Sequence, residues 1–208
     1  MHSFHTLLIL VAITLPAVTA AAADPAPTGA PSRVNGGTRV RPYDRRAAAL
    51  VVEGLRRSDR LRALIDELEE RNVIVYVQTM PSLKGRLAGS LTWMTATKGF
   101  RYVRVSLNPE LRGAAAIATL AHELQHALEV ANESSIVDAA SLTLYYKRNG
   151  ISVRAHENGW DTEAARTVGD EVRHDLSVSR AGHIVESLQD FDPANWHIVY
   201  RRAREWRR

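Results

Sequence analysis

The sequence predicts an α+β protein in which a small, mostly antiparallel sheet packs on helices. Segments with helical spacing of apolar residues lie on both sides of a block, residues 73–107, that is rich in β-branched and aromatic residues. The chain has 208 residues, 45% of them hydrophobic and 24% charged, as is usual for one folded domain. It contains no cysteine, which excludes disulfides, thiolate metal ligands and a cysteine nucleophile.

The N-terminal residues are typical of an export signal. An apolar run at residues 7–18 is too short to span a bilayer as a stable helix, and small residues follow it at 18–23. We therefore expect residues 1–23 to be a signal peptide and the mature protein to be periplasmic or secreted; a buried N-terminal strand or helix is the alternative. Residues 24–44 are rich in Pro, Gly and polar residues, which predicts a flexible lead-in to a single domain at 45–208.

The first half of that domain should contain two helices and then strands. Residues 47–55 have helical spacing, and Ser58 or Asp59 can cap a second helix. Strands are expected at 73–80, 87–96 and 100–107, the last two joined by a turn at Thr97-Lys98-Gly99. Because apolar and polar residues alternate along 103–107, we expect only one face of the sheet to be buried.

Helices should dominate the second half. Asn108-Pro109-Glu110 provides an N-cap, a proline at the first helical position and an acid in the first turn of a helix that runs to residue 132. The first turns of this helix are small or apolar, so it should pass through the centre of the domain. Further helices are expected from Ser134 or Ser135 to Gly150, over 162–176, and from Asp192-Pro193 onward.

The central helix carries the sequence TLAHELQHALEV, residues 119–130. His122 and His126 are four residues apart, a spacing that puts both imidazoles on one helical face where they can bind one metal ion. A catalytic zinc needs two such ligands, a third protein ligand, an open position for water and a glutamate that takes the proton of that water. Glu123 is placed for this last role. The pattern therefore predicts that His122 and His126 bind Zn²⁺ and that Glu123 is the general base, although HExxH also occurs by chance in ordinary helices.

Strands, then an HExxH helix, then a further helix with a glutamate: this order resembles small zincin metallopeptidases of the gluzincin type, including short exported bacterial proteins. The resemblance covers residues 73–175, and HELQH is its only specific motif. It implies a minimal zincin-like core, a peptide or protein substrate, and an edge strand beside the metal that pairs with the extended substrate backbone. It also implies a third ligand that is a glutamate on a downstream helix. Glu163 in DTEAARTV matches best, and its competitors are Asp138, His156, Glu157 and Asp170.

A second class of enzyme is compatible with part of the pattern. Glu123 and His126 form a Glu-x-x-His pair, and Glu171 and His174 form another. Two such pairs, with a glutamate from each of two other helices, make the di-iron site of ferritin-like bundles. Glu53 or Glu67, together with Glu163, would complete it. The strands at 73–107 and the absence of a role for His122 argue against this alternative.

The third hypothesis is that the chain is a non-enzymatic, envelope-binding protein. The C-terminal segment combines an apolar stripe, with Trp196 and Trp206, and five arginines after residue 200. Such a basic amphipathic helix can lie on an anionic membrane or cell wall, in keeping with the formal net charge of +4. Alternatively the tryptophans dock the helix on the core and its basic face is solvated. We expect no nucleic-acid partner.

Overall fold

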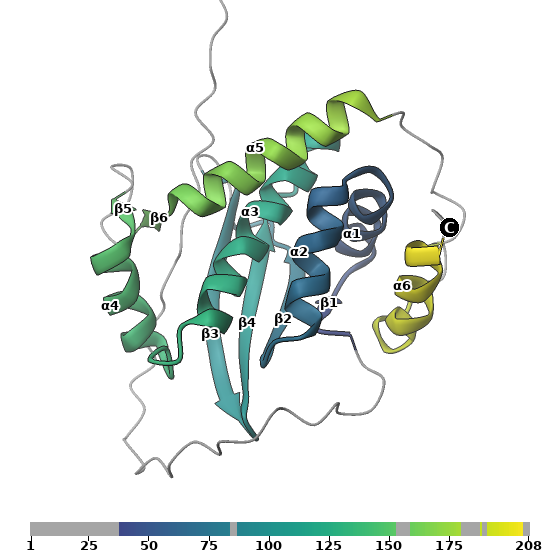
Figure 1. Cartoon of the computed structure of the whole chain (residues 1–208). Coiled ribbons are helices and arrows are strands. Elements are labelled where there is room, and N and C mark those ends of the chain that lie inside the picture. Colours follow the sequence, from purple (N-terminus) through teal and green to yellow (C-terminus); the bar gives the residue numbers. More distant parts are fainter. Residues whose placement is uncertain (1–37, 84–86, 153–158, 180–187, 189–190, 206–208) are drawn as a thin grey trace, which may run out of the picture.

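The described residues of the computed structural model are 38–83, 87–152, 159–179, 188 and 191–205 (Figure 1). The helices are α1 (Arg45–Arg57), α2 (Asp59–Glu69), α3 (Gly113–Asn132), α4 (Ala139–Asn149), α5 (Glu163–Val178), the 3₁₀ turn η2 (Pro193–Asn195) and α6 (Trp196–Glu205). The strands are β1 (Val40–Pro42), β2 (Val73–Thr79), β3 (Gly89–Thr97), β4 (Phe100–Leu107), β5 (Ile151–Ser152) and β6 (Trp160–Asp161). No helix among these residues is both long and apolar enough to cross a membrane.

The central sheet has the strand order β1-β2-β4-β3, and β5 pairs with β6 in a separate antiparallel ribbon. The predicted α+β class is confirmed, but the central sheet is mixed rather than mostly antiparallel. β2 is parallel to both β1 and β4, and only the β3–β4 hairpin is antiparallel. The parallel pair β1–β2 is joined through α1 and α2, a connection long enough to bring the chain back in the same direction.

One face of the sheet carries the core. Helices α1 and α3 pack on it (Figure 1), and the strand residues that point toward them are buried valines and leucines. The alternate residues of β4, Tyr102 and Arg104, are half-buried, as the period of two predicts. The expected turn between β3 and β4 is also present: Lys98 and Gly99 have φ of 51° and 77°, and the glycine takes the left-handed conformation without steric cost.

Strand β1 lies in the segment for which the sequence suggested a flexible lead-in. Val40 is fully buried, and its carbonyl accepts a 2.8 Å hydrogen bond from Trp196 Nε1. Asp44 caps α1 through Ala47 N, and its other oxygen accepts from Thr79 N of β2. Residues 38–44 therefore belong to the fold, which a strand of three residues could not reveal by periodicity. The expected signal peptide, residues 1–23, lies outside the described residues.

Two helices begin later than predicted. Instead of starting α3, Asn108 fastens a loop: its amide donates to the carbonyls of Leu83 and Leu87, and its oxygen accepts from Glu110 N. α3 then begins at Gly113. α4 begins after Asp138, whose carboxylate and Ser141 form a reciprocal capping box. Asn108 is thus used in a loop and Asp138, which was a candidate metal ligand, is used in a helix cap.

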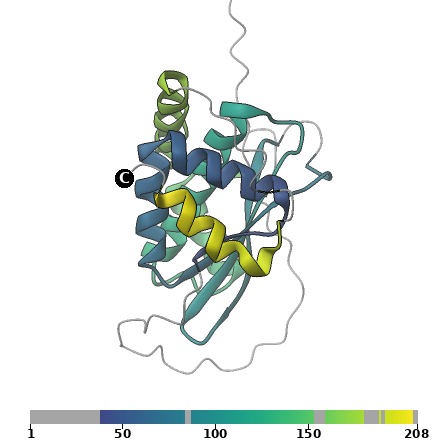
Figure 2. The same ribbon diagram turned by 90° about the vertical axis from the view of Figure 1, so that its right-hand side faces the viewer.

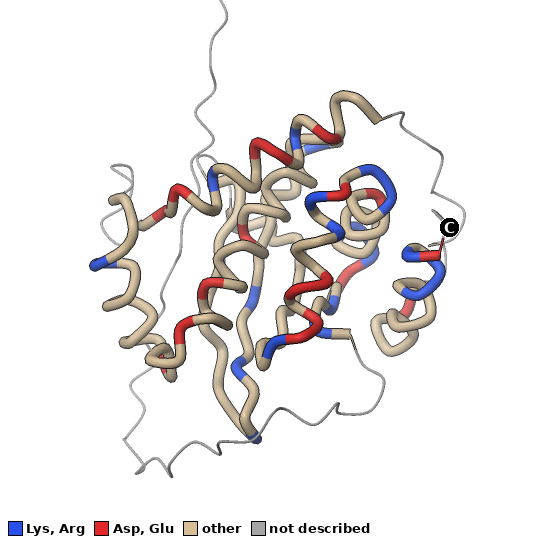
Figure 3. The backbone as a smooth tube through the Cα atoms, in the orientation of Figure 1, with Lys and Arg blue, Asp and Glu red and all other residues tan. Residues whose placement is uncertain are grey.

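The C-terminal helix is docked on the core. α6 lies beside α1 (Figure 2) and buries Trp196, Tyr200 and Ala203. Basic residues of α6 and acidic residues of α2 are coloured in Figure 3, and Arg204 of α6 forms an ion pair of 2.6 Å with Asp66 of α2. The described residues of the apolar stripe are therefore used for intramolecular packing, while Trp206 lies outside the described residues.

Candidate metal centre

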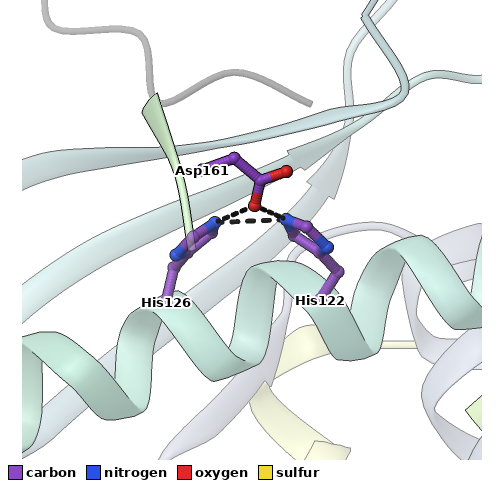
Figure 4. Close-up of side chains that lie close together, drawn as sticks. All are labelled: His122, His126 and Asp161. Atoms are coloured by element: carbon purple, nitrogen blue, oxygen red, sulfur yellow. Dashed lines mark hydrogen bonds and ion pairs between the residues drawn. The ribbon is translucent and has the colours of Figure 1, made fainter. Parts of the chain in front are cut away.

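The two histidines of HELQH meet on one face of α3. Both side chains are buried, and their Nε2 atoms are 3.2 Å apart. The helix is apolar on most of its surface because it lies between the sheet and α5, with Ile117, Leu120 and Leu124 fully buried. The predicted spacing of His122 and His126 thus brings two nitrogen donors to one point, as Figure 4 shows.

A carboxylate that is distant in sequence lies beside the two histidines. Asp161, at the end of β6, directs Oδ1 toward both imidazoles, 3.1 Å from His122 Nε2 and 3.7 Å from His126 Nε2 (Figure 4). Its other oxygen, Oδ2, accepts from Arg166 Nε at 2.7 Å. His122, His126 and Asp161 therefore form a cluster of three potential metal ligands in the described part of the chain.

This geometry replaces Glu163 by Asp161 as the third candidate ligand. Glu163 is the first residue of α5, is exposed, and is not part of the cluster. Thr162 caps α5 through Ala165 N, so the chain turns between the two acids. β6 pairs with β5, and α5 packs on α3. These contacts put Asp161, before the cap, against the histidines and leave Glu163, after the cap, in solvent.

The spacing of the three donor atoms suits a single zinc ion. Ligands at 2.0–2.2 Å around a tetrahedral zinc lie roughly 3.3–3.6 Å from one another. The three observed separations, 3.1, 3.2 and 3.7 Å, bracket that range. Two imidazoles and one carboxylate are also a donor set that catalytic zinc sites use, with a fourth position left open. The residues present therefore fit the ion.

Glu123 is buried without a partner. Its side chain is 0% exposed, and neither carboxylate oxygen has a hydrogen-bond partner among the described residues. It faces the start of β3, where a Cβ on Gly89 would lie only 2.8 Å from Glu123 Oε1. An unsatisfied buried carboxylate is costly to keep, so its position beside the histidines calls for a functional explanation.

A second glutamate of α3 is half-buried and fully bonded. Glu129 Oε2 is 2.9 Å from His126 Nδ1 and accepts from the Tyr146 hydroxyl at 3.0 Å. Its Oε1 accepts from the Thr162 hydroxyl at 2.6 Å. The sequence reasoning did not identify Glu129 or Asp161. A signal for Glu129 was present, because a residue seven after His122 and three after His126 lies on the same helical face.

The surroundings set the charge states that metal ligands need. Burial lowers the pKa of His122, which keeps the imidazole neutral at physiological pH. Burial acts to raise the pKa of Asp161, but its bonds with His122 and Arg166 outweigh burial and bring that pKa to about 2. Burial likewise opposes ionisation of Glu129, yet hydrogen bonds from His126, Thr162 and Tyr146 hold its pKa below the usual value. Glu123 is the exception: burial, and then the charges of Asp161 and Glu129, raise its pKa well above normal.

The residues proposed for a di-iron site are not brought together. Glu171 pairs with Arg60 at 2.6 Å, and His174 is exposed. Glu53 bonds to Arg57 within α1. Of the other competitors for the third ligand, Asp170 pairs with Arg173 on the exposed side of α5, while His156 and Glu157 lie outside the described residues.

The hydroxyl of Tyr146 lies close to the ring of His126. Tyr146 is fully buried, and its hydroxyl donates a hydrogen bond to Glu129 and lies 3.2 Å from His126 Nδ1. It therefore supports the imidazole from the side away from Asp161.

Comparisons with family models, with curated proteins and with solved structures find no match to this chain.

Proposed function

We propose that this protein is a zinc-dependent peptidase. His122 Nε2, His126 Nε2 and Asp161 Oδ1 hold the metal, and Glu123 is the general base. The observation that carries the proposal is the convergence of these three donor atoms beside a buried carboxylate that has no hydrogen-bond partner in the described part of the chain. A structural zinc would be closed by four protein ligands, whereas the described cluster contains three.

The chemistry follows from this donor set. When bound, zinc supplies a Lewis acid that lowers the pKa of a water ligand to about 7 and polarises the carbonyl of the scissile amide. The free oxygens of Glu123 accept the proton of the attacking water and then deliver it to the leaving amine. Burial raises the pKa of Glu123, which strengthens it as a base compared with a solvated glutamate.

The position of β3 supports an extended substrate. In the described four-stranded sheet β3 is an edge strand, whereas β4 is paired on both sides, so of the two strands of this hairpin only β3 has an edge to which another strand could add. Its first residue, Gly89, packs against Glu123. A substrate backbone that adds to this edge would gain main-chain hydrogen bonds with little sequence preference, which favours a peptide substrate.

Metal content tests the proposed ligands. Mass spectrometry of purified mature protein should give about one zinc per chain, in keeping with a three-ligand catalytic site. His126→Ala and Asp161→Ala should lose the metal, whereas Glu163→Ala, two residues from Asp161 but exposed, should keep it. Zinc retained in Asp161→Ala and lost in Glu163→Ala would restore the assignment made from sequence. Two irons per chain would support the di-iron alternative.

Activity tests the role of Glu123. Glu123→Gln keeps the size of the side chain but removes the base, so hydrolysis of a quenched fluorescent peptide library should fall by about 10²–10⁴-fold while zinc remains bound. Full activity in Glu123→Gln would contradict the mechanism.

A further inference from the structure

Glu129 occupies a special position behind the metal ligands. It is half-buried on the same face of α3 as the two histidines and accepts hydrogen bonds from three other residues, His126, Tyr146 and Thr162. These three belong to α3, α4 and the residue that caps α5. One carboxylate therefore joins three separate elements at the candidate centre.

The contact with His126 determines which ring nitrogen can bind a metal. An ionised carboxylate only accepts hydrogen bonds, so His126 Nδ1, 2.9 Å from Glu129 Oε2, must carry the proton. The lone pair is then left on Nε2, the atom that faces His122 and Asp161. The opposite tautomer would direct an N–H into the cluster and could not bind the ion.

The contact with Thr162 reaches the third ligand. The hydroxyl of Thr162 donates to Glu129 Oε1 at 2.6 Å, and the backbone N–H of Thr162 donates to Asp161 Oδ1 at 2.7 Å. Thr162 thus contacts both Glu129 and the carboxylate oxygen that faces the imidazoles. Since Asp161 comes from β6 and the histidines come from α3, this link sets the distance between ligands that are far apart in sequence.

We propose that Glu129 is the positioning residue of the metal centre, fixing the Nε2-binding tautomer of His126 and, through Thr162, the place of Asp161. This inference rests on the metal centre proposed above, but it is independent of peptidase activity. Outer partners of this kind typically change metal affinity 10–100-fold when they are removed.

Glu129→Gln is the decisive variant. It preserves side-chain size, but an amide NH₂ facing His126 Nδ1 would favour the opposite tautomer. The zinc dissociation constant, measured by competition with a chromophoric chelator, should rise about 10–100-fold. Glu129→Asp, which remains an acceptor only, should recover part of the affinity. Glu133→Gln is the matched control. Glu133 is the C-cap of the same helix, and its carboxylate accepts a hydrogen bond from the backbone of the neighbouring Ser135, so this variant should leave zinc affinity unchanged.

Nitrogen-15 NMR of the histidine rings in metal-free protein provides a readout that packing alone would not change. Wild type should show His126 protonated at Nδ1, and Glu129→Gln should shift the population toward the Nε2–H form. Wild-type protein with His126 in the Nε2–H form overturns the inference without any variant having to fold. Zinc affinity of Glu129→Gln within twofold of wild type, with an unchanged tautomer, also overturns it. A wild-type chain with the expected tautomer but no zinc affinity instead contradicts the proposed function.

Discussion

Glu123 and Glu129 lie on one helix but differ in their surroundings, because Glu123 is buried without a partner among the described residues and Glu129 is half-buried and fully bonded. Replacing each by methionine should therefore change stability in opposite directions. Methionine has a similar length and volume but no hydrogen-bonding oxygen. At Glu123 it removes two oxygens that have no partner. At Glu129 it leaves the hydroxyls of Tyr146 and Thr162 and the ring N–H of His126 without their acceptor.

The magnitudes follow from the burial of each group. A buried polar group left unsatisfied costs about 1–3 kcal/mol, and more when charged. Glu123→Met should therefore raise the free energy of unfolding of the metal-free protein by about 1–3 kcal/mol. Glu129→Met should lower it by about 2–5 kcal/mol, because it orphans several buried groups at once. In a chain of 208 residues each kcal/mol corresponds to about 2–4 °C in Tm.

The assay is urea denaturation of chelator-treated protein, followed by circular dichroism, with Tm as a second measure. Equal slopes of the free energy of unfolding against urea concentration would show that the two variants expose as much surface on unfolding as wild type does. If Glu123→Met lost stability as Glu129→Met does, the carboxylate of Glu123 would be held by favourable contacts. It would then not be the uncommitted base on which the proposed mechanism depends.

Three further predictions concern the surroundings of the site. Gly89→Ala places a Cβ 2.8 Å from Glu123 Oε1, so turnover should fall by up to about 100-fold with zinc content unchanged. The matched control is Gly169→Ala. Its Cβ would lie at an ordinary contact distance of 3.5 Å from His122 Cβ, so this variant should keep activity. Comparable kcat/KM values for the two variants would contradict this account. Because burial puts the pKa of His122 below its usual 6.5, the unfolded chain binds the proton first, and metal-free protein should lose stability as pH falls below about 6.5. Tm measured against pH should show this slope, weakened in His122→Gln; a Tm that rises as the pH is lowered through this range would contradict it. Trp196→Ala should destabilise by about 3–5 kcal/mol in urea, since it removes packing of α6 and the bond to Val40, while zinc affinity stays the same. A loss below 1 kcal/mol would mean that α6 is not anchored on the core.

The sequence was sufficient for those features that depend on local periodicity. The spacing of His122 and His126 predicted two donors on one face, and the strands at 73–107 were recognised from their composition. Features set by long-range pairing were not predictable. The parallel neighbours of β2 depend on where the chain returns after α1 and α2, and the three residues of β1 are too few to carry a pattern.

The third candidate ligand also depends on long-range contacts that the sequence does not reveal. Asp161 and Glu163 flank the cap Thr162, and either carboxylate could have approached α3 as far as local chemistry is concerned. The choice was made by two tertiary contacts, the β5–β6 pairing and the packing of α5 on α3. No spacing rule within α5 contains that information, which is why a helical glutamate was the natural prediction.

The orientation of the Glu123 side chain also indicates the side from which a substrate would approach. Successive residues on a helix are about 100° apart, so Glu123 cannot share the face of His122 and instead points toward β3. There the strand begins with Gly89, which provides space but no side-chain donor, and the carboxylate remains unpaired. Glu129 is seven residues after His122, returns to the ligand face and is saturated with hydrogen bonds. One glutamate of the helix thus bonds to the candidate ligand His126, and the other has no partner among the described residues and lies on the side of the edge strand. If the proposed reaction is correct, the scissile carbonyl must approach between the histidines and the start of β3, because that is where the unpaired base lies.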